Sequence, residues 1–556
     1  MVLFRKSVRK SDDVHLPMDP EGRRRRRPSF LHNSDAGAMS TEAATADAEA
    51  VDHEQIASLA LSTYLGLPPR GAKPGVKSNG RLEWTVLAAF ALSFPSTDGS
   101  KPREYTLISL ATGLRCLPYA SLTVHGDVLH DQHAEVLARR AARLWLLHRL
   151  EQEHTSPGSG VNSLFEPEHS DALDGAKRWR LRSGVQCHLY VSTLPCGAAS
   201  SRLLEFQRAA QDAAAQKPGA PTPDKLLNRY LCGSTDGLTT SSSRSGAADV
   251  VRGRASSTQQ PGTSASLRTK PGRPDAPPSI CMSCSDKLAL WNAPGVGIQG
   301  ALLSALIAPV HISSVTIADH PLRYIFPPSY PDAEARVDQL KLVLADDCKR
   351  ALERAMDGRR SIQVGWSEAV YPDSKEAKLQ TSSTEAEPES CVNSVVHIAD
   401  PTGKGKGKKA KTENLAAGTK MGAPTKRAAE QPLKPAARSG VCRLNYFGAV
   451  VATMRATGRS VPDGLVYANA KQGCLGGGTM AYRQAKDAVL GPRDAAQQAV
   501  DSFLERATRA TAINTPAPAP GDALHPSADA PPLHGWLRSP AHLAHFDLSG
   551  HRTRQA

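Results

Sequence analysis

The sequence is poor in aromatic side chains and has no long apolar run. Phe, Trp and Tyr make up 5% of the 556 residues, whereas 41 prolines and 43 glycines accompany long stretches of Ala, Ser and Thr. Such a composition cannot fill a core along the whole chain. A run of about 18 apolar residues, the minimum for a membrane-spanning helix, is absent. We therefore expect the ordered part to be smaller than the chain, and no membrane partner.

Cysteines are few and irregularly spaced. Ten thiols in a chain of this length lack the dense spacing of a small secreted scaffold, which favours reduced thiols and a location in the nucleus, the cytoplasm or both. The N-terminus has no apolar core and carries acidic residues such as Asp12 and Glu21. It therefore fits neither a secretory signal nor a transit peptide. Metal binding or catalysis is then the expected special use of a cysteine.

Acidic residues are outnumbered by basic ones. The chain has 68 Lys and Arg against 54 Asp and Glu, a formal net charge of +14, which favours a polyanionic partner such as nucleic acid. Two tracts, at residues 23–27 and 404–411, hold much of this excess. They fit a nuclear localisation signal or simple solvated charge. Charge thus indicates a class of partner and not an activity.

Composition divides the chain into one interrupted α/β region and low-complexity segments. We interpret residues 1–52 as disordered and residues 53–550 as one domain, with insertions at about 208–266, 373–440 and 515–532. Strands that alternate with helices predict an α/β fold. The apolar patterns predict strands at 105–110, 187–193 and 310–318, a short strand-like segment at 392–398 within the second insertion, and helices at 134–150, 297–307, 333–356, 445–456 and 481–506.

His133, Ala134 and Glu135 stand at a predicted loop-to-helix junction. A histidine that offers a nitrogen to zinc, with a carboxylate two residues on, suits a metal-bound water and its proton shuttle. The tripeptide alone also fits a surface histidine beside a helix-starting glutamate. The chemistry therefore depends on partners elsewhere in the chain.

Two cysteines further along are candidates for the other ligands. Cys196 follows the predicted strand 187–193, and Cys284 lies 88 positions later. Three protein ligands leave the fourth position of a zinc ion open, which is the catalytic pattern. Zinc deaminases combine H-x-E with P-C-x-x-C, but Ala199 stands where the second cysteine would be. Cys281 and Cys284 also form a CxxC, which fits half of a structural zinc site or a redox pair.

Several segments resemble one family. Residues 130–140 (HDQHAEVLARR), 192–197 (STLPCG) and 282–287 (MSCSDK) are similar to the deaminase domain shared by tRNA-specific adenosine deaminases and double-stranded-RNA editing adenosine deaminases. The resemblance implies a cytidine-deaminase-like zinc core, with helices around a mixed sheet. Further similar blocks lie at 83–89, 267–273, 291–292, 297–303 and 535–540.

The resemblance also implies the site residues. His133, Cys196 and Cys284 would hold zinc, and Glu135 would carry the proton while water adds to C6 of adenine. Adenosine would become inosine. Departures from the family pattern, such as Ala198 in place of an aspartate, affect the expected geometry of the substrate loop and not the reaction type.

The same resemblance implies a buried inositol hexakisphosphate. Such a ligand needs inward-facing cations, which would be costly in a core without the anion. Leu290 stands where the editing branch has an arginine, so the ligand shell differs there from that branch. The family's positions are matched by Arg139, Arg140, Lys287, Trp291, Gln299, Lys404, Tyr467, Lys471, Tyr482, Lys486 and Trp536.

The expected substrate is tRNA. The mRNA-editing relatives carry RNA-binding domains ahead of the deaminase, and the first 52 residues or so offer no room for one. The Leu194–Pro195 pair and the segments 268–273 and 536–540 look more like the tRNA branch. We expect deamination of the adenosine immediately 3′ of the anticodon (position 37) of tRNA-Ala, with no DNA partner. The alternatives are an enzyme that edits double-stranded RNA or mRNA, and a catalytically silent RNA-binding relative.

Overall fold

The computed structural model describes a set of ranges that begins at residue 50. The basic tract at 23–27, most of the expected disordered segment, and Lys404 lie outside these ranges, as does most of the expected insertion at 515–532. The described residues are 50–96, 102–155, 163–168, 178–232, 250–252, 267–270, 276–382, 386–402, 410–428, 430–493, 496–513 and 531–553.

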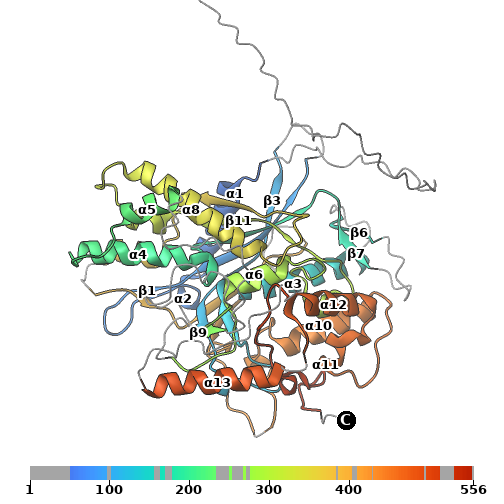
Figure 1. Ribbon diagram of the computed structural model, residues 1–556. Coiled ribbons are helices and arrows are strands. Elements are labelled where there is room, and N and C mark those ends of the chain that lie inside the picture. The colour runs from blue at the N-terminus through green and yellow to red at the C-terminus, as the bar shows by residue number, and fades with distance from the viewer. Residues whose placement is uncertain are drawn as a thin grey trace, which may run out of the picture. The chain divides into compact units, whose positions relative to one another are not determined.

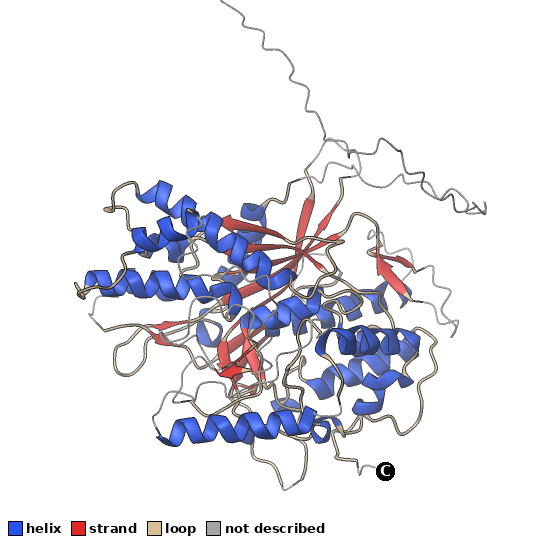
Figure 2. Ribbon diagram, viewed as in Figure 1, coloured by secondary structure: helices blue, strands red, loops and turns tan. Residues whose placement is uncertain are grey.

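A mixed sheet of eight strands forms the centre of the described part (Figures 1 and 2). Its order is β12-β11-β8-β2-β3-β14-β15-β16; β8, β11 and β12 run parallel to one another, and the other neighbours pair antiparallel. The three predicted strands are confirmed as β3, β8 and β11. The strands are β2 Leu87–Phe94, β3 Glu104–Thr112, β8 Gln186–Val191, β11 Ile312–Ala318, β12 Gln363–Ser367, β14 Ser394–Ile398, β15 Lys411–Ala416 and β16 Thr419–Lys420.

Both faces of this sheet are covered because successive strand residues point to opposite sides. In β2, Leu87 and Ala89 belong to a core that includes helix α1 (His53–Leu65), whereas Phe90 and Leu92 belong to the larger core around α3. Burial on both faces explains why β2 reads as a continuous apolar run. The predicted α/β class is therefore confirmed, with helices on either side of a mixed sheet.

The helices differ from the predicted ones mainly where glycine interrupts them. Only α7 is helical within the expected 297–307, and the expected 481–506 is divided at Gly491, whose φ of +80° ends α12. The helices are α1, α2 Pro69–Ala72, α3 Ala134–Thr155, α4 Ser201–Ala214, α5 Pro223–Leu231, α6 Cys284–Asn292, α7 Gly300–Leu303, α8 Ala333–Glu353, α9 Lys375–Thr381, α10 Arg443–Ala456, α11 Tyr467–Asn469, α12 Gly477–Leu490 and α13 Ala496–Ile513.

Two of the expected insertions contain regular structure. Helices α4 and α5 occupy the first part of 208–266 and pack with α8, and Leu226 and Leu227 of α5 are buried. Within 373–440, β14 and β15 extend the central sheet beyond β3. The strand-like segment predicted at 392–398 is confirmed as β14. The other short elements lie between Ser- and Lys-rich stretches, which dilute their apolar pattern.

Four short strand pairs complete the described part, and one of them positions the site. Strand β5 ends at His133 and leads directly into α3. No helix among the described residues is long and apolar enough to cross a membrane. The pairs are β1 Glu83–Trp84 with β13 Glu389–Ser390, β4 Leu114–Cys116 with β5 Asp131–His133, β6 Phe165–Pro167 with β7 Trp179–Leu181, and β9 Val251–Arg252 with β10 Arg268–Thr269.

Candidate active site and cationic cluster

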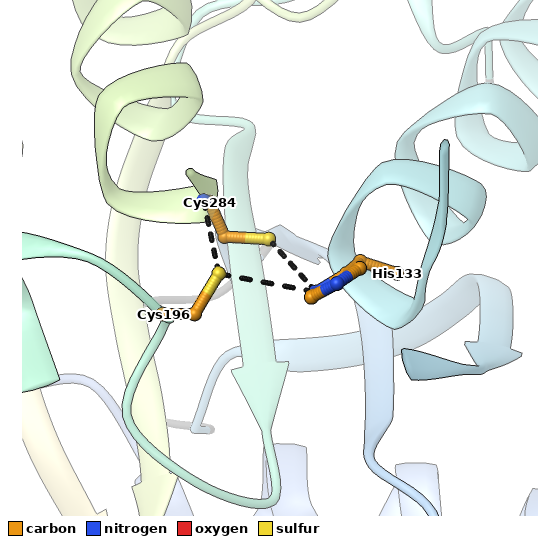
Figure 3. Close-up of side chains that lie close together, drawn as sticks. All are labelled: His133, Cys196 and Cys284. Carbon is orange, nitrogen blue, oxygen red and sulfur yellow. Dashed lines mark hydrogen bonds between the residues drawn. The ribbon is translucent and has the colours of Figure 1, made fainter. Parts of the chain in front are cut away.

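The three residues predicted to bind metal lie together (Figure 3). Nδ1 of His133 lies 3.9 Å from Sγ of Cys196 and 3.7 Å from Sγ of Cys284. Ligands at the corners of a tetrahedral zinc site, with bonds of about 2.3 Å to sulfur and about 2.0 Å to nitrogen, lie roughly 3.5–3.8 Å apart. The donor set and its spacing fit zinc, and three protein ligands leave the fourth position open for water or substrate.

Three separate elements deliver these ligands. His133 ends β5, Cys196 lies in the loop after β8, and Cys284 is the first residue of α6. The loop approaches α6 closely at Gly197, where φ is +113° and an added Cβ would lie 2.3 Å from Oγ of Ser283. Only glycine fits this backbone and this space. The sequence Pro-Cys-Gly thus lets the Cys196 loop close on the start of α6.

The surroundings of Cys196 favour a thiolate, the form that binds zinc. The backbone N–H of Cys284, at the positive end of α6, donates to Sγ of Cys196 at 3.3 Å. The side chain of Cys284, followed by the charge of Lys270, holds the pKa of Cys196 well below its ordinary value. Nζ of Lys270 also lies 3.1 Å from Sγ of Cys284.

Glu135 lies beside the metal-ligand group without belonging to it. Its side chain is in the first turn of α3 and is 4% exposed. Burial, the adjacent Cys196 and then the Glu135 carboxylate raise the pKa of Cys284. A buried carboxylate whose charge reaches a ligand sulfur is placed as a proton carrier for this site requires.

Cys281 is directed away from this group. Its Sγ donates to the backbone oxygen of His130 at 3.8 Å and contacts the side chain of Cys116. The three-member group of His133, Cys196 and Cys284 does not include it. The geometry therefore favours an open three-ligand site over a CxxC half-site.

Asp131 connects the metal-ligand group to further cations. Its carboxylate pairs with Nζ of Lys270 at 2.9 Å and with Nζ of Lys287, and it accepts the backbone N–H of His133 at 3.0 Å. Burial alone would raise the pKa of Asp131, but Lys270 and Lys287 hold it well below its usual range. The carboxylate is thus ionised and fixes the backbone of a metal ligand.

A second constellation consists of half-buried cations from four helical segments. Burial, followed by the charge of Arg143, lowers the pKa of Arg139 to about 9, and burial lowers the pKa of Lys486 to about 8. Burial, followed by the charges of Lys486 and Arg443, lowers the pKa of Lys471 well below its ordinary value. We call this set the cationic cluster; its members are Arg139, Arg140, Arg143, Arg443, Lys471 and Lys486.

Within the described ranges, no carboxylate forms an ion pair with a member of the cationic cluster. The nearby Asp487 pairs instead with Arg493 at 3.0 Å and Arg538 at 2.8 Å. Nε of Arg139 is buried without a hydrogen-bond partner, and the same holds for Nε2 of His130 beside the cluster. Half-buried cations that repel one another without counter-charge fit an anionic ligand with several charges.

The residues implied as anion ligands differ in where their side chains lie. Arg139 stacks on Trp291 at 4.4 Å and Lys471 on Tyr467 at 5.3 Å, so these aromatic rings line the cationic cluster. The amide of Gln299 is directed elsewhere, to Val296, Ser304 and Val310. The other implied residues lie as follows: Arg140, Lys486 in the cluster; Tyr482 close to Arg139; Lys287 paired with Asp131; Trp536 half-buried against the main core; and Lys404 outside the described residues.

A family model described as the adenosine-deaminase (editase) domain matches residues 109–490. The chain belongs to this family. The mouse protein named tRNA-specific adenosine deaminase 1 is 28% identical over 346 residues, which cover 48% of this chain and 65% of the relative. The Schizosaccharomyces pombe protein of the same name is 32% identical over 251 residues, 45% of this chain and 53% of the relative.

A relative with a different name matches a shorter part of the editase domain. The Drosophila melanogaster double-stranded RNA-specific editase Adar is 32% identical over 221 residues, which cover 39% of this chain and 28% of the relative. The chain thus spans less than two thirds of the length of each of these three relatives.

Sequence reasoning about the editase domain missed several residues of its site. Asp131 and Lys270 stand in the blocks that carried the resemblance, so their proximity to the metal ligands offered a signal. Arg143 is one helical turn from Arg139, and this i,i+4 spacing on a predicted helix was a second signal. Arg443 had none, because its place in the cluster depends on how α10 packs on α3.

Proposed function

We propose that this chain is a zinc-dependent deaminase that converts adenosine to inosine in tRNA, at the adenosine immediately 3′ of the anticodon of tRNA-Ala. The group of His133, Cys196 and Cys284 with buried Glu135 beside it carries this proposal. The names of the mouse and S. pombe relatives support tRNA as the substrate. The similarity to the Drosophila editase favours double-stranded RNA as the second candidate.

The proposed reaction assigns one task to each group. Zinc held by His133, Cys196 and Cys284 would supply an activated water for attack on C6 of adenine. Glu135 would move both protons of that water, one to N1 of the ring and the other to the leaving amino group, so that ammonia departs and the oxygen stays on C6. Asp131 holds the backbone of His133, and Lys270 donates toward Cys284, so both keep the ligands in position.

We further propose inositol hexakisphosphate as the ligand of the cationic cluster. One phosphate carries only about two negative charges, which is too few for a cluster of six cations without carboxylates. A molecule with several phosphates on one small ring matches this charge density. Lys404 remains a predicted ligand of the same anion.

The substrate is tested by comparing two RNAs. A base has to leave its stack to reach a buried metal, and an anticodon loop presents it unpaired at a smaller cost than a duplex does. The purified chain is incubated with folded tRNA-Ala or with a long perfect duplex, and the products are sequenced for adenosine read as guanosine. We expect conversion at the position 3′ of the anticodon and little in the duplex. Editing along the duplex with tRNA untouched favours the second candidate, and no inosine in either RNA favours a silent relative.

A further inference from the structure

We propose that Arg143 binds the polyanion of the cationic cluster, and that it supplies from α3 the positive charge that α6 lacks at Leu290. The inference rests on the proposed anion.

Helix α6 contributes little free charge to the cluster. Lys287 and Trp291 are four residues apart and share one helix face, and Leu290 lies on that face as well. The ammonium of Lys287 is already paired with Asp131. Leu290 is 4% exposed and belongs to the main core. Position 290 therefore supplies hydrocarbon and no charge on the helix face that Lys287 and Trp291 share.

Helix α3 places the guanidinium of Arg143 beside that of Arg139. Arg143 lies four residues after Arg139 and so shares its helix face. Its Nε donates to the backbone oxygen of Gln299 at 2.8 Å, and its guanidinium carbon lies 4.1 Å from the ring centre of Tyr446. These two contacts fix the group, and its charge lowers the pKa of both Arg139 and Lys471 after burial has done so. The guanidinium thus belongs to the cluster by position.

Gly300 leaves space for two guanidinium groups side by side. Its φ is +69°, and an added Cβ would lie 3.2 Å from Cζ of Arg143 and 3.3 Å from Nη2 of Arg139. The two positive charges beside Gly300 repel each other, and a bound anion would offset this repulsion. Because a guanidinium can bind a phosphate through two parallel N–H groups, the pair is suited to hold neighbouring phosphates.

The test compares variants of the full chain. Bound inositol phosphate per chain is measured by mass spectrometry after acid release, and the binding of added inositol hexakisphosphate is followed by the rise in the thermal unfolding midpoint. The wild-type chain is compared with Arg143→Leu and with the matched control Arg455→Leu, which removes an exposed arginine of α10. We expect Arg143→Leu to bind the anion about tenfold more weakly, and Arg455→Leu to behave like wild type.

Two further variants keep the inference falsifiable if Arg143→Leu folds poorly. Leu290→Arg in the Arg143→Leu background should restore binding, because position 290 shares the face of Lys287 and Trp291. Gly300→Ala, which retains Arg143 but crowds it, should weaken binding. Wild-type binding by Arg143→Leu, or no restoration by Leu290→Arg, overturns the inference. If the wild-type chain neither carries inositol phosphate nor responds to it, the anion proposal itself fails, and that result is distinct from a failure of Arg143 alone.

Discussion

Nζ of Lys270 lies 3.1 Å from Sγ of Cys284. The same ammonium pairs with Asp131, which also pairs with Lys287 on the helix that begins at Cys284. A metal ligand is thereby joined to a buried network of charges. Removing the lysine deprives a thiolate of a donor and leaves Asp131 with one cation fewer.

Lys270→Met should therefore weaken metal binding without removing a ligand. Loss of a group that orients a metal ligand typically lowers metal affinity about 10- to 100-fold. The measurement is zinc retention against a competing chelator, with Lys217→Met as the control because the Lys217 side chain is 63% exposed. Unchanged zinc retention in Lys270→Met would show that the contact with Cys284 has no role at the metal.

His133→Ala, Cys196→Ala and Cys284→Ala should each lose zinc, because two remaining ligands hold the ion poorly. Cys281→Ala is the matched control, since its thiol contacts Cys116 and not the metal-ligand group. The measurement is the zinc content of each purified variant. Loss of zinc from Cys281→Ala would contradict the open three-ligand site.

Glu135→Gln should keep zinc and lose deamination by about 10²- to 10⁴-fold, the range for a positioned proton carrier. The amide has nearly the same shape but cannot accept the proton. Zinc content and inosine formation are measured on the same preparation. If zinc and activity disappear together, Glu135 is a ligand and the proton carrier has to be sought elsewhere.

Anion binding to the cationic cluster should weaken above about pH 8. In the anion-free protein, burial and then Arg538 and Arg493 lower the pKa of Lys486 to about 8. Below that pH the lysine is already charged, whereas above it binding requires proton uptake. Affinity then falls by up to about tenfold per pH unit until the ordinary lysine pKa near 10.4 is reached.

The measurement for this prediction is the dissociation constant for inositol hexakisphosphate between about pH 7 and pH 10. Lys486→Arg should flatten the dependence, because arginine stays charged over this range. An affinity that rises with pH would mean that Lys486 does not face the anion.

The metal-ligand residues could be predicted from the sequence, whereas most of the cationic cluster's geometry could not. His133, Cys196 and Cys284 have side chains with a restricted chemistry, and each stands next to an element boundary that local pattern reveals. Arginines and lysines are common on helix surfaces, so nothing local separates Arg443 from the exposed Arg455 on the same helix. Only the packing of α10 on α3 distinguishes Arg443 from Arg455.

The strands of the central sheet also differ in how far the sequence predicts them. The long strands β3, β8 and β11 follow from uninterrupted apolar runs. The pattern at 392–398 predicts a strand, but the place of β14 in the sheet depends on pairing with β3, almost 300 positions earlier, and β15 in turn pairs with β14. Pairing over such a distance leaves no local pattern in the sequence.

The cationic cluster joins α3 to α12, from Arg139 to Lys486. During synthesis, α3 leaves the ribosome long before α12, and contacts between such distant segments form late in folding. Each arriving cation then meets a surface that is already positive. We therefore expect the proposed anion, if present at that moment, to make this last step attractive, so that the yield of folded chain depends on the supply of the anion while the protein is being made.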